Sequence, residues 1–282
     1  MIIASLAVVG LCLGSFVNAV VWSIHEQAKQ SKTKKTDKKY ARRLSIARGR
    51  SMCPDCKHEL SAKDLMPLLS WLSLGGKCRY CCKPISIQYP LVELAMAGVF
   101  AMSYVWWPAE LQGVQMAVFG LWLAILTGLM ALLVYDLHWM LLPNRLIYPL
   151  SLLATLQAVI IVVTSTEPLL VITNTALATV VGGGIFYLLF QVSKGKWIGG
   201  GDVRLGWLLG LVVATPARAF LMIFLASLIG SLASLPLLIS KRMNRTSTIP
   251  FGPFLIIATM LVQLFGTDIL TWYQRTFMTF AG

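Results

Sequence analysis

Two aspartates, Asp136 and Asp202, lie where long apolar runs of the sequence meet short polar turns. Asp136 ends one apolar run a few residues before Pro143, and Asp202 directly follows three glycines, residues 199–201. Three glycines give a permissive backbone that another chain can approach closely, whereas Asp202 could alternatively be no more than the N-cap of a helix. An ionisable side chain at membrane depth is costly, so it marks a functional site. Two neighbouring carboxyl groups can share a proton, which lets one polarise a peptide carbonyl while the other activates water. The pair therefore predicts aspartyl-type hydrolysis, provided that the fold brings the two side chains together.

Four of the six cysteines form two Cys-x-x-Cys pairs, Cys53 with Cys56 and Cys78 with Cys81, separated by 21 residues. This spacing is typical of a tetrahedral zinc site. Four thiolates leave no open coordination position, so such a metal would be structural and would hold together a loop too small to build its own core. The alternative is a pair of disulfides or unliganded thiols. The adjacent Cys82 could also replace one ligand.

The composition is that of a membrane protein. Of the 282 residues, 57% are hydrophobic and 12% are charged, with a mean hydropathy of +0.74, whereas soluble domains carry roughly 25% charged residues. We expect an all-α polytopic fold with about eight transmembrane helices and a cytoplasmic zinc-binding loop after the first, which we interpret as a retained span. The predicted spans are 2–24, 89–107, 113–135, 146–164, 169–192, 203–215, 217–240 and 250–272. Pro216 can turn or kink the chain between the sixth and the seventh of them.

The positive charge predicts the orientation. Residues 25–87 contain 15 of the 24 Lys and Arg residues but only 5 of the 11 acidic ones. Beside a membrane span such an excess indicates a cytoplasmic loop near anionic lipid, not a nucleic-acid partner. If 25–87 is cytoplasmic, alternation places both aspartates on the same side. The basic segment 29–43 has no apolar periodicity, and we interpret it as an insert that lies on lipid head groups.

An ordered series of motifs resembles the bacterial type IV prepilin peptidases over nearly the whole chain. The motifs are Gly14-Ser15-Phe16-Val17-Asn18, Arg50 to Cys56, Leu69-Ser70-Trp71-Leu72, Gly76 to Cys81, Ile85-Ser86, Tyr89 to Leu94, Asp136 to Asn144, Gly199 to Arg204 and Pro250-Phe251-Gly252-Pro253-Phe254.

The resemblance implies a membrane aspartyl endopeptidase of the GxGD type, with Asp136 and Asp202 as its catalytic pair and the four cysteines as its zinc ligands. Such enzymes remove the short basic leader of prepilins and pseudopilins at the cytoplasmic face of the bacterial inner membrane. They then methylate the new N-terminus with S-adenosylmethionine. Residues 1–107 would be the methyltransferase-associated region and 108–282 the peptidase region. Glu93, in the matched segment after the cysteine loop, is either a contact of the methyl donor or a carboxylate at the entry of a helix. The family usually has Lys where this chain has Arg204, and the two side chains are not interchangeable where geometry is tight.

Two other functions compete with this interpretation. A proton-coupled transporter could use the aspartates as a relay, but it would place them near the bilayer midplane and have related halves. Both aspartates are instead predicted at the cytoplasmic edge. A zinc-loop interaction protein without enzymatic activity would leave the glycine-flanked Asp202 unexplained.

Overall fold

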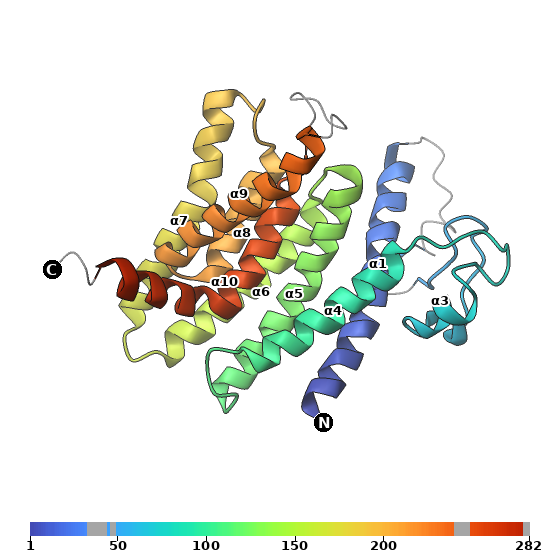
Figure 1. The fold of residues 1–282 in the computed structure, drawn as a ribbon, viewed down its shortest axis with the longest axis horizontal. Coiled ribbons are helices and arrows are strands. Elements are labelled where there is room, and N and C mark those ends of the chain that lie inside the picture. The colour runs from blue at the N-terminus through green and yellow to red at the C-terminus, as the bar shows by residue number, and fades with distance from the viewer. Residues whose placement is uncertain (33–43, 46–48, 240–248, 279–282) are drawn as a thin grey trace. The chain divides into compact units, whose positions relative to one another are not determined.

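The computed structural model describes residues 1–32, 44–45, 49–239 and 249–278, and they form two compact units, Met1–Val105 and Trp106–Gly282. The first unit contains α1 (Ile2–Lys32), the 3-10 turn η1 (Ala62–Leu65), α3 (Leu69–Ser73) and α4 (Gln88–Val105). The second contains α5 (Val114–Trp139), α6 (Asn144–Thr164), α7 (Pro168–Ser193), α8 (Gly200–Val213), α9 (Pro216–Ile239), α10 (Gly252–Tyr273) and the π-helical turn η2 (Gln274–Met278) (Figure 1).

The prediction of an all-helical, multi-pass membrane protein is confirmed. Six helices of the described chain are long and apolar enough to cross a membrane: α1, α5, α6, α7, α9 and α10. The two other predicted spans correspond to α4 and α8, which have 18 and 14 residues. At 1.5 Å per residue α8 is only about 21 Å long, shorter than a hydrocarbon core of about 30 Å. The total of eight spans therefore stays a prediction. Residues 33–43 of the predicted basic insert lie outside the described residues.

In the first unit, α1 and α4 pack side by side (Figure 1). Two glycines one turn apart on α1 permit this approach. A Cβ at Gly10 would lie 2.7 Å from the carbonyl oxygen of Met96, and one at Gly14 would lie 2.7 Å from the Cα of Glu93. Small residues four apart let helix backbones come this close inside a membrane. The long cysteine loop connects the end of α1 to the start of α4, so both helices support it.

In the second unit, α5 is largely buried, with Trp122 and Leu126 fully enclosed. Its neighbours include α6 and α10, and α8 packs against α6, α7 and α10. The α7–α8 contact is again close, since a Cβ at Gly210 would lie 2.7 Å from the Cα of Thr179. The chain turns between α8 and α9 at Ala214, which is left-handed at φ +59°, and Pro216 then begins α9. This is the break that the proline predicted.

Candidate active site and metal centre

Asp136 lies in the last turn of α5 and its side chain is buried, with 4% of the residue exposed. The helix ends soon afterwards, because Met140 adopts the left-handed conformation at φ +50° and its N–H donates to the Asp136 carbonyl oxygen at 2.8 Å. Tyr135 and Trp139 stack beside it with ring centroids 4.5 Å apart. The sequence prediction placed Asp136 at the end of an apolar run, and the structure keeps it inside the protein, not at an exposed helix end.

Asp202 occupies the third position of α8 and is half-buried. Its carboxylate accepts a hydrogen bond from the backbone N–H of Gly199, the residue that caps the helix. A side chain at this position that reaches back to the cap satisfies one of the free N–H groups of the first turn. The N-cap is Gly199, so the alternative interpretation of Asp202 as the N-cap is wrong.

The start of α10 supplies a third component that sequence reasoning did not assign to the site. The backbone N–H of Gly252 donates to the Asp136 carboxylate, and a Cβ at this position would overlap with that carboxylate. The free N–H groups and positive dipole at a helix N-terminus stabilise an anion. Phe251 helps to fix this helix start, because its ring packs against Phe186 of α7 with centroids 5.9 Å apart. The only sequence signal for this role was the Pro-Phe-Gly-Pro motif at residues 250–253.

The second unit thus brings the predicted aspartates together. The carboxyl groups of Asp136 and Asp202, 66 residues apart in the sequence, interact electrostatically. The backbone N–H of Gly252 at the start of α10 donates to Asp136, and that of Gly199 at the cap of α8 donates to Asp202. Two acidic groups that interact electrostatically favour a state in which one is protonated and the other ionised. That state is the one required for acid/base hydrolysis of a peptide bond.

The glycine run before Asp202 is used differently from the way the sequence suggested. None of the three glycines appears among the residues with positive φ, so left-handed backbone is not the reason for them. Gly201 instead allows close packing within this chain, since a Cβ there would lie 3.1 Å from the Cβ of Leu142. A Cβ at Gly200 would have only Phe190 nearby, at 3.9 Å. Gly200 therefore leaves room for the approach of another backbone, whereas Gly201 does not.

Arg204 links the second aspartate's helix to a neighbour. Its guanidinium Nη1 donates to the Asn144 side-chain oxygen at 2.6 Å, which ties the first turn of α8 to the start of α6. Asn144 follows Pro143, which precedes α6 in the extended conformation. Arg204 follows Asp202 by two residues, so the pair positions the helix end that carries the carboxylate.

In the first unit, the four predicted zinc ligands converge. The sulfur atoms of Cys53, Cys56, Cys78 and Cys81 all lie within 4.8 Å of one another. Tetrahedral zinc with Zn–S bonds of about 2.3 Å needs sulfur atoms separated by roughly 3.8 Å, and Cys53 Sγ and Cys81 Sγ are 3.9 Å apart. All four thiols are free, which argues against the disulfide alternative. The donor set fits a four-coordinate metal ion.

The two cysteine pairs form matching backbone turns. In the first, the Cys53 N–H donates to His58 O at 3.0 Å and the Lys57 N–H donates to Cys53 O at 2.9 Å. The second turn, residues 78–83, repeats both bonds at 2.9 Å. Lys57 and Cys82 are equivalent residues, and both have φ +57°. Cys82 is exposed and stands outside the four-sulfur cluster, so the structure does not place it as a replacement ligand.

Backbone donors prepare one thiol for metal binding. Although burial raises the pKa of the Cys78 thiol, hydrogen bonds from the N–H groups of Cys81 and Tyr80 outweigh it and lower that pKa to about 7. Only a deprotonated thiolate binds zinc. Donors of this kind therefore favour the metal-bound form at neutral pH.

A polar network braces the loop around the cluster. Asp64 in η1 accepts hydrogen bonds from Arg79 Nε at 2.7 Å and Tyr80 Oη at 3.0 Å. Burial disfavours this carboxylate, but the hydrogen bonds from Arg79, Ser61 and Tyr80 outweigh it and hold the pKa of Asp64 well below its usual range. The two cysteine turns are also joined by the Lys83–Asp55 ion pair at 2.8 Å.

The fold and the two sites define a class: a polytopic membrane protein in which a pair of helix-end aspartates accompanies a four-thiol loop. Comparison with known proteins agrees. Residues 8–107 match the bacterial peptidase A24 N-terminal domain and residues 123–235 match the type IV leader peptidase family. The chain belongs to the peptidase A24 family of prepilin leader peptidase/N-methyltransferases.

Several curated relatives share this likeness over most of their length. A prepilin leader peptidase/N-methyltransferase of Aeromonas hydrophila is 34% identical over 81% of this chain and 76% of its own. Homologues with the same name from Bacillus subtilis and Pseudomonas aeruginosa are each 31% identical, over 82% and 97% of this chain and 88% and 92% of their own. No solved structure matches the chain at a significant level.

Proposed function

We propose that this protein cleaves the short basic leader of type IV prepilins and pseudopilins with Asp136 and Asp202, and then N-methylates the trimmed product. The observation that carries the proposal is the electrostatic interaction between the carboxyl group at the end of α5 and the one at the start of α8, with the Gly252 N–H donating to Asp136. A protonated carboxyl group would polarise the scissile carbonyl, and its ionised partner would remove a proton from the attacking water. The names of the relatives, all leader peptidases, support the substrate class.

Metal chemistry has no part in this hydrolysis. We assign Cys53, Cys56, Cys78 and Cys81 to a structural zinc ion, which would tie the two cysteine turns together. Four thiolates leave no coordination position for water or substrate. The cluster belongs to the unit Met1–Val105, whereas both aspartates belong to Trp106–Gly282. Zinc would therefore stabilise the fold of the first unit and take no direct part in hydrolysis.

We assign the methylation step to residues 1–107, which include the whole of the first unit. S-adenosylmethionine supplies an electrophilic methyl group, and its transfer to the neutral N-terminal amine forms an N–C bond, breaks the S–C bond to leave a thioether, and releases a proton. The name N-methyltransferase of the relatives implies such a donor. The protein's contribution is to bind the donor and to exclude competing water from the reacting methyl group.

We further infer that the cysteine loop and both aspartates face the cytoplasm in the bacterial inner membrane. The support is the charge of residues 25–87, which hold 15 of the 24 basic residues. Short loops rich in Lys and Arg stay on the cytoplasmic side and contact anionic lipid. Labelling a cysteine introduced near Lys35 with an impermeant reagent in intact cells tests this, because labelling would reverse the orientation.

The aspartate pair is tested with Asp136→Asn and Asp202→Asn, each reconstituted in lipid with a full-length prepilin. Asn keeps the shape of the side chain but cannot exchange a proton, so each variant should lose about 10³-fold or more in leader cleavage. Asp268→Asn, an exposed carboxylate on α10, is the matched control and should cleave normally. Near-normal cleavage by either site variant would remove that aspartate from the mechanism.

A further inference from the structure

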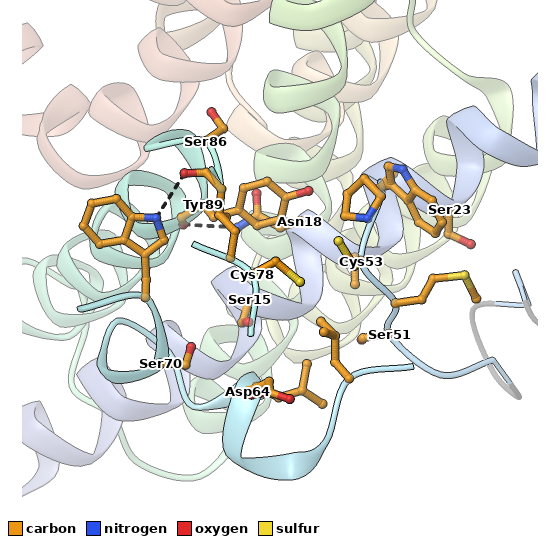
Figure 2. Close-up of a pocket in the computed structure, with 18 of the residues that line it drawn as sticks. Ser15, Asn18, Ser23, Ser51, Cys53, Asp64, Ser70, Cys78, Ser86 and Tyr89 are labelled. Carbon is orange, nitrogen blue, oxygen red and sulfur yellow. Dashed lines mark hydrogen bonds between the residues drawn. The ribbon is translucent and has the colours of Figure 1, made fainter. Parts of the chain in front are cut away.

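The first unit encloses a cavity of about 510 Å³ that the proposed peptidase chemistry does not use. Small-molecule sites usually have volumes of about 300–1,000 Å³. The cavity is walled by α1, the cysteine loop, the short helices of the loop and the start of α4. Figure 2 draws Ser15 and Asn18 of α1, Tyr89 of α4 and the metal-site residues Cys53 and Cys78 around it.

Asn18 lines this cavity with an unused hydrogen-bond acceptor. The residue is only 4% exposed, and its side-chain nitrogen donates to the Tyr89 carbonyl oxygen at 3.2 Å. Its side-chain oxygen is buried and has no hydrogen-bond partner. Because buried polar atoms are nearly always hydrogen-bonded, an orphan that lines a cavity indicates a missing donor. A ligand with an N–H group would supply that donor.

Glu93 adds a buried carboxylate to the same cavity, at 6% exposure. Its Oε2 accepts from the backbone N–H of Leu68 at 2.8 Å, and Ser15 hydrogen-bonds to the carboxylate as well. Neither partner is a cation, and none of the ion pairs found among the described residues includes Glu93. The other acidic groups that line the cavity differ, since Asp55 is paired with Lys83 and Asp64 with Arg79.

No cation among the described residues is paired with this buried carboxylate, and a ligand that brings a positive charge would stabilise its ionised form. Glu93 is also fixed in place, because the Gly14 backbone of α1 lies directly against its Cα. The cavity therefore combines a fixed anion with an unsatisfied acceptor. It also has an aromatic wall, since Trp71 lines it and is oriented by a hydrogen bond from its indole N–H to Ile85 O at 3.2 Å. Such a ring offers a stacking surface for a planar base.

We propose that this cavity binds the sulfonium methyl donor, with Glu93 and Asn18 both facing the ammonium group of its amino-acid end and Trp71 contacting its base. This assignment rests on the methyltransferase activity proposed above and gives it a location. The three features match a ligand that is at once cationic, rich in N–H donors and partly aromatic. The trimmed N-terminus of a pilin is also a cation, but it has no base for the aromatic wall.

The test is equilibrium dialysis of the full-length protein in detergent with radiolabelled S-adenosylmethionine, without any pilin. Glu93→Gln keeps the hydrogen bonds and removes the charge, so affinity should fall at least about tenfold, or about 1.4 kcal/mol. Asn18→Leu, which removes the acceptor at similar volume, should weaken binding by about three- to tenfold. Glu110→Gln, an exposed carboxylate in the loop before α5, is the control and should bind normally. Bound zinc and thermal stability report folding in every sample.

The outcomes separate the two proposals. Donor binding within twofold of wild type by a folded Glu93→Gln protein would overturn this site while leaving the proposed function intact. The site would also be wrong, with the function intact, if Glu93→Gln lost affinity for a trimmed pilin peptide but kept its affinity for the donor. If the wild-type protein neither binds the donor nor methylates a cleaved prepilin, the methyltransferase function itself is wrong. If Glu93→Gln loses zinc or unfolds, the decision falls to Asn18→Leu, where unchanged donor affinity contradicts the site.

Discussion

The two units position their reactive side chains in different ways. In the second unit, Asp136 and Asp202 are held at the ends of long helices, and backbone N–H groups of Gly252 and Gly199 donate to them. In the first, four cysteines are held by a loop whose described residues include only short helical turns and isolated β-bridges. The aspartates depend on helix packing alone, whereas the cysteine loop needs cross-links. Loss of the metal should therefore destabilise the first unit more than the second.

After the aspartate variants themselves, the largest loss of leader cleavage is expected where α10 approaches α5 closely. Gly252→Ala would place a Cβ against the Asp136 carboxylate, so the side chain must move. A displacement of about 1 Å at a catalytic group can cost about 100-fold in rate, and we expect leader cleavage to fall at least that much. Zinc content should not change. Gly120→Ala in α5, where a Cβ meets nothing within 4 Å, is the matched control. Normal cleavage by Gly252→Ala would show that this helix start does not hold the aspartate.

The second expected effect concerns the cysteine loop of the first unit. Replacing Cys53 and Cys56 together with Ser removes two of four ligands, so zinc should be lost and the first unit should unfold at lower temperature. Cys82→Ser is the control, because Cys82 lies outside the cluster. Metal analysis and thermal melting of the purified proteins measure both results. Full zinc retention by the double variant would remove these cysteines from the ligand set.

The smallest effect concerns the link between α6 and α8. Lys in place of Arg204 can still donate one hydrogen bond to Asn144, so Arg204→Lys should keep cleavage within about tenfold, about 1.4 kcal/mol of barrier. Arg204→Ala and Asn144→Ala should each cost more, and the double variant should cost no more than the larger single effect. Fully additive losses in this cycle would show that the two side chains act independently.

The sequence predicted the helices better than it predicted their contacts. Long apolar runs were sufficient to place the six spanning helices, and Pro216 was sufficient to predict the break before α9. The spacing of the cysteines predicted their convergence, because two Cys-x-x-Cys turns have few other uses. The predicted spans 89–107 and 203–215 correspond to α4 and α8, and the hydrophobic pattern alone does not decide whether helices of 18 and 14 residues cross the membrane.

The parts of the sites that were missed depend on backbone atoms and on distant pairs. The Gly252 N–H donates to Asp136 only because α10 packs beside α5, and no side-chain pattern encodes such a contact. Asn18 and Glu93 come together through the crossing of α1 and α4. Glu93 was singled out only through the family resemblance, and Asn18 only as part of a motif. Their shared cavity follows from tertiary structure alone.

The most direct test of the central claim, that hydrolysis and metal belong to separate units, is one reaction analysed by intact-mass spectrometry. The wild-type protein is incubated with a prepilin and S-adenosylmethionine before and after zinc removal by a chelator, and zinc content and folding are measured in the same samples. We predict that the zinc-depleted protein still releases trimmed pilin, with cleavage reduced less than about tenfold, while the added methyl mass disappears. Immediate loss of cleavage in protein that remains folded would contradict the account, because the metal would then take part in hydrolysis.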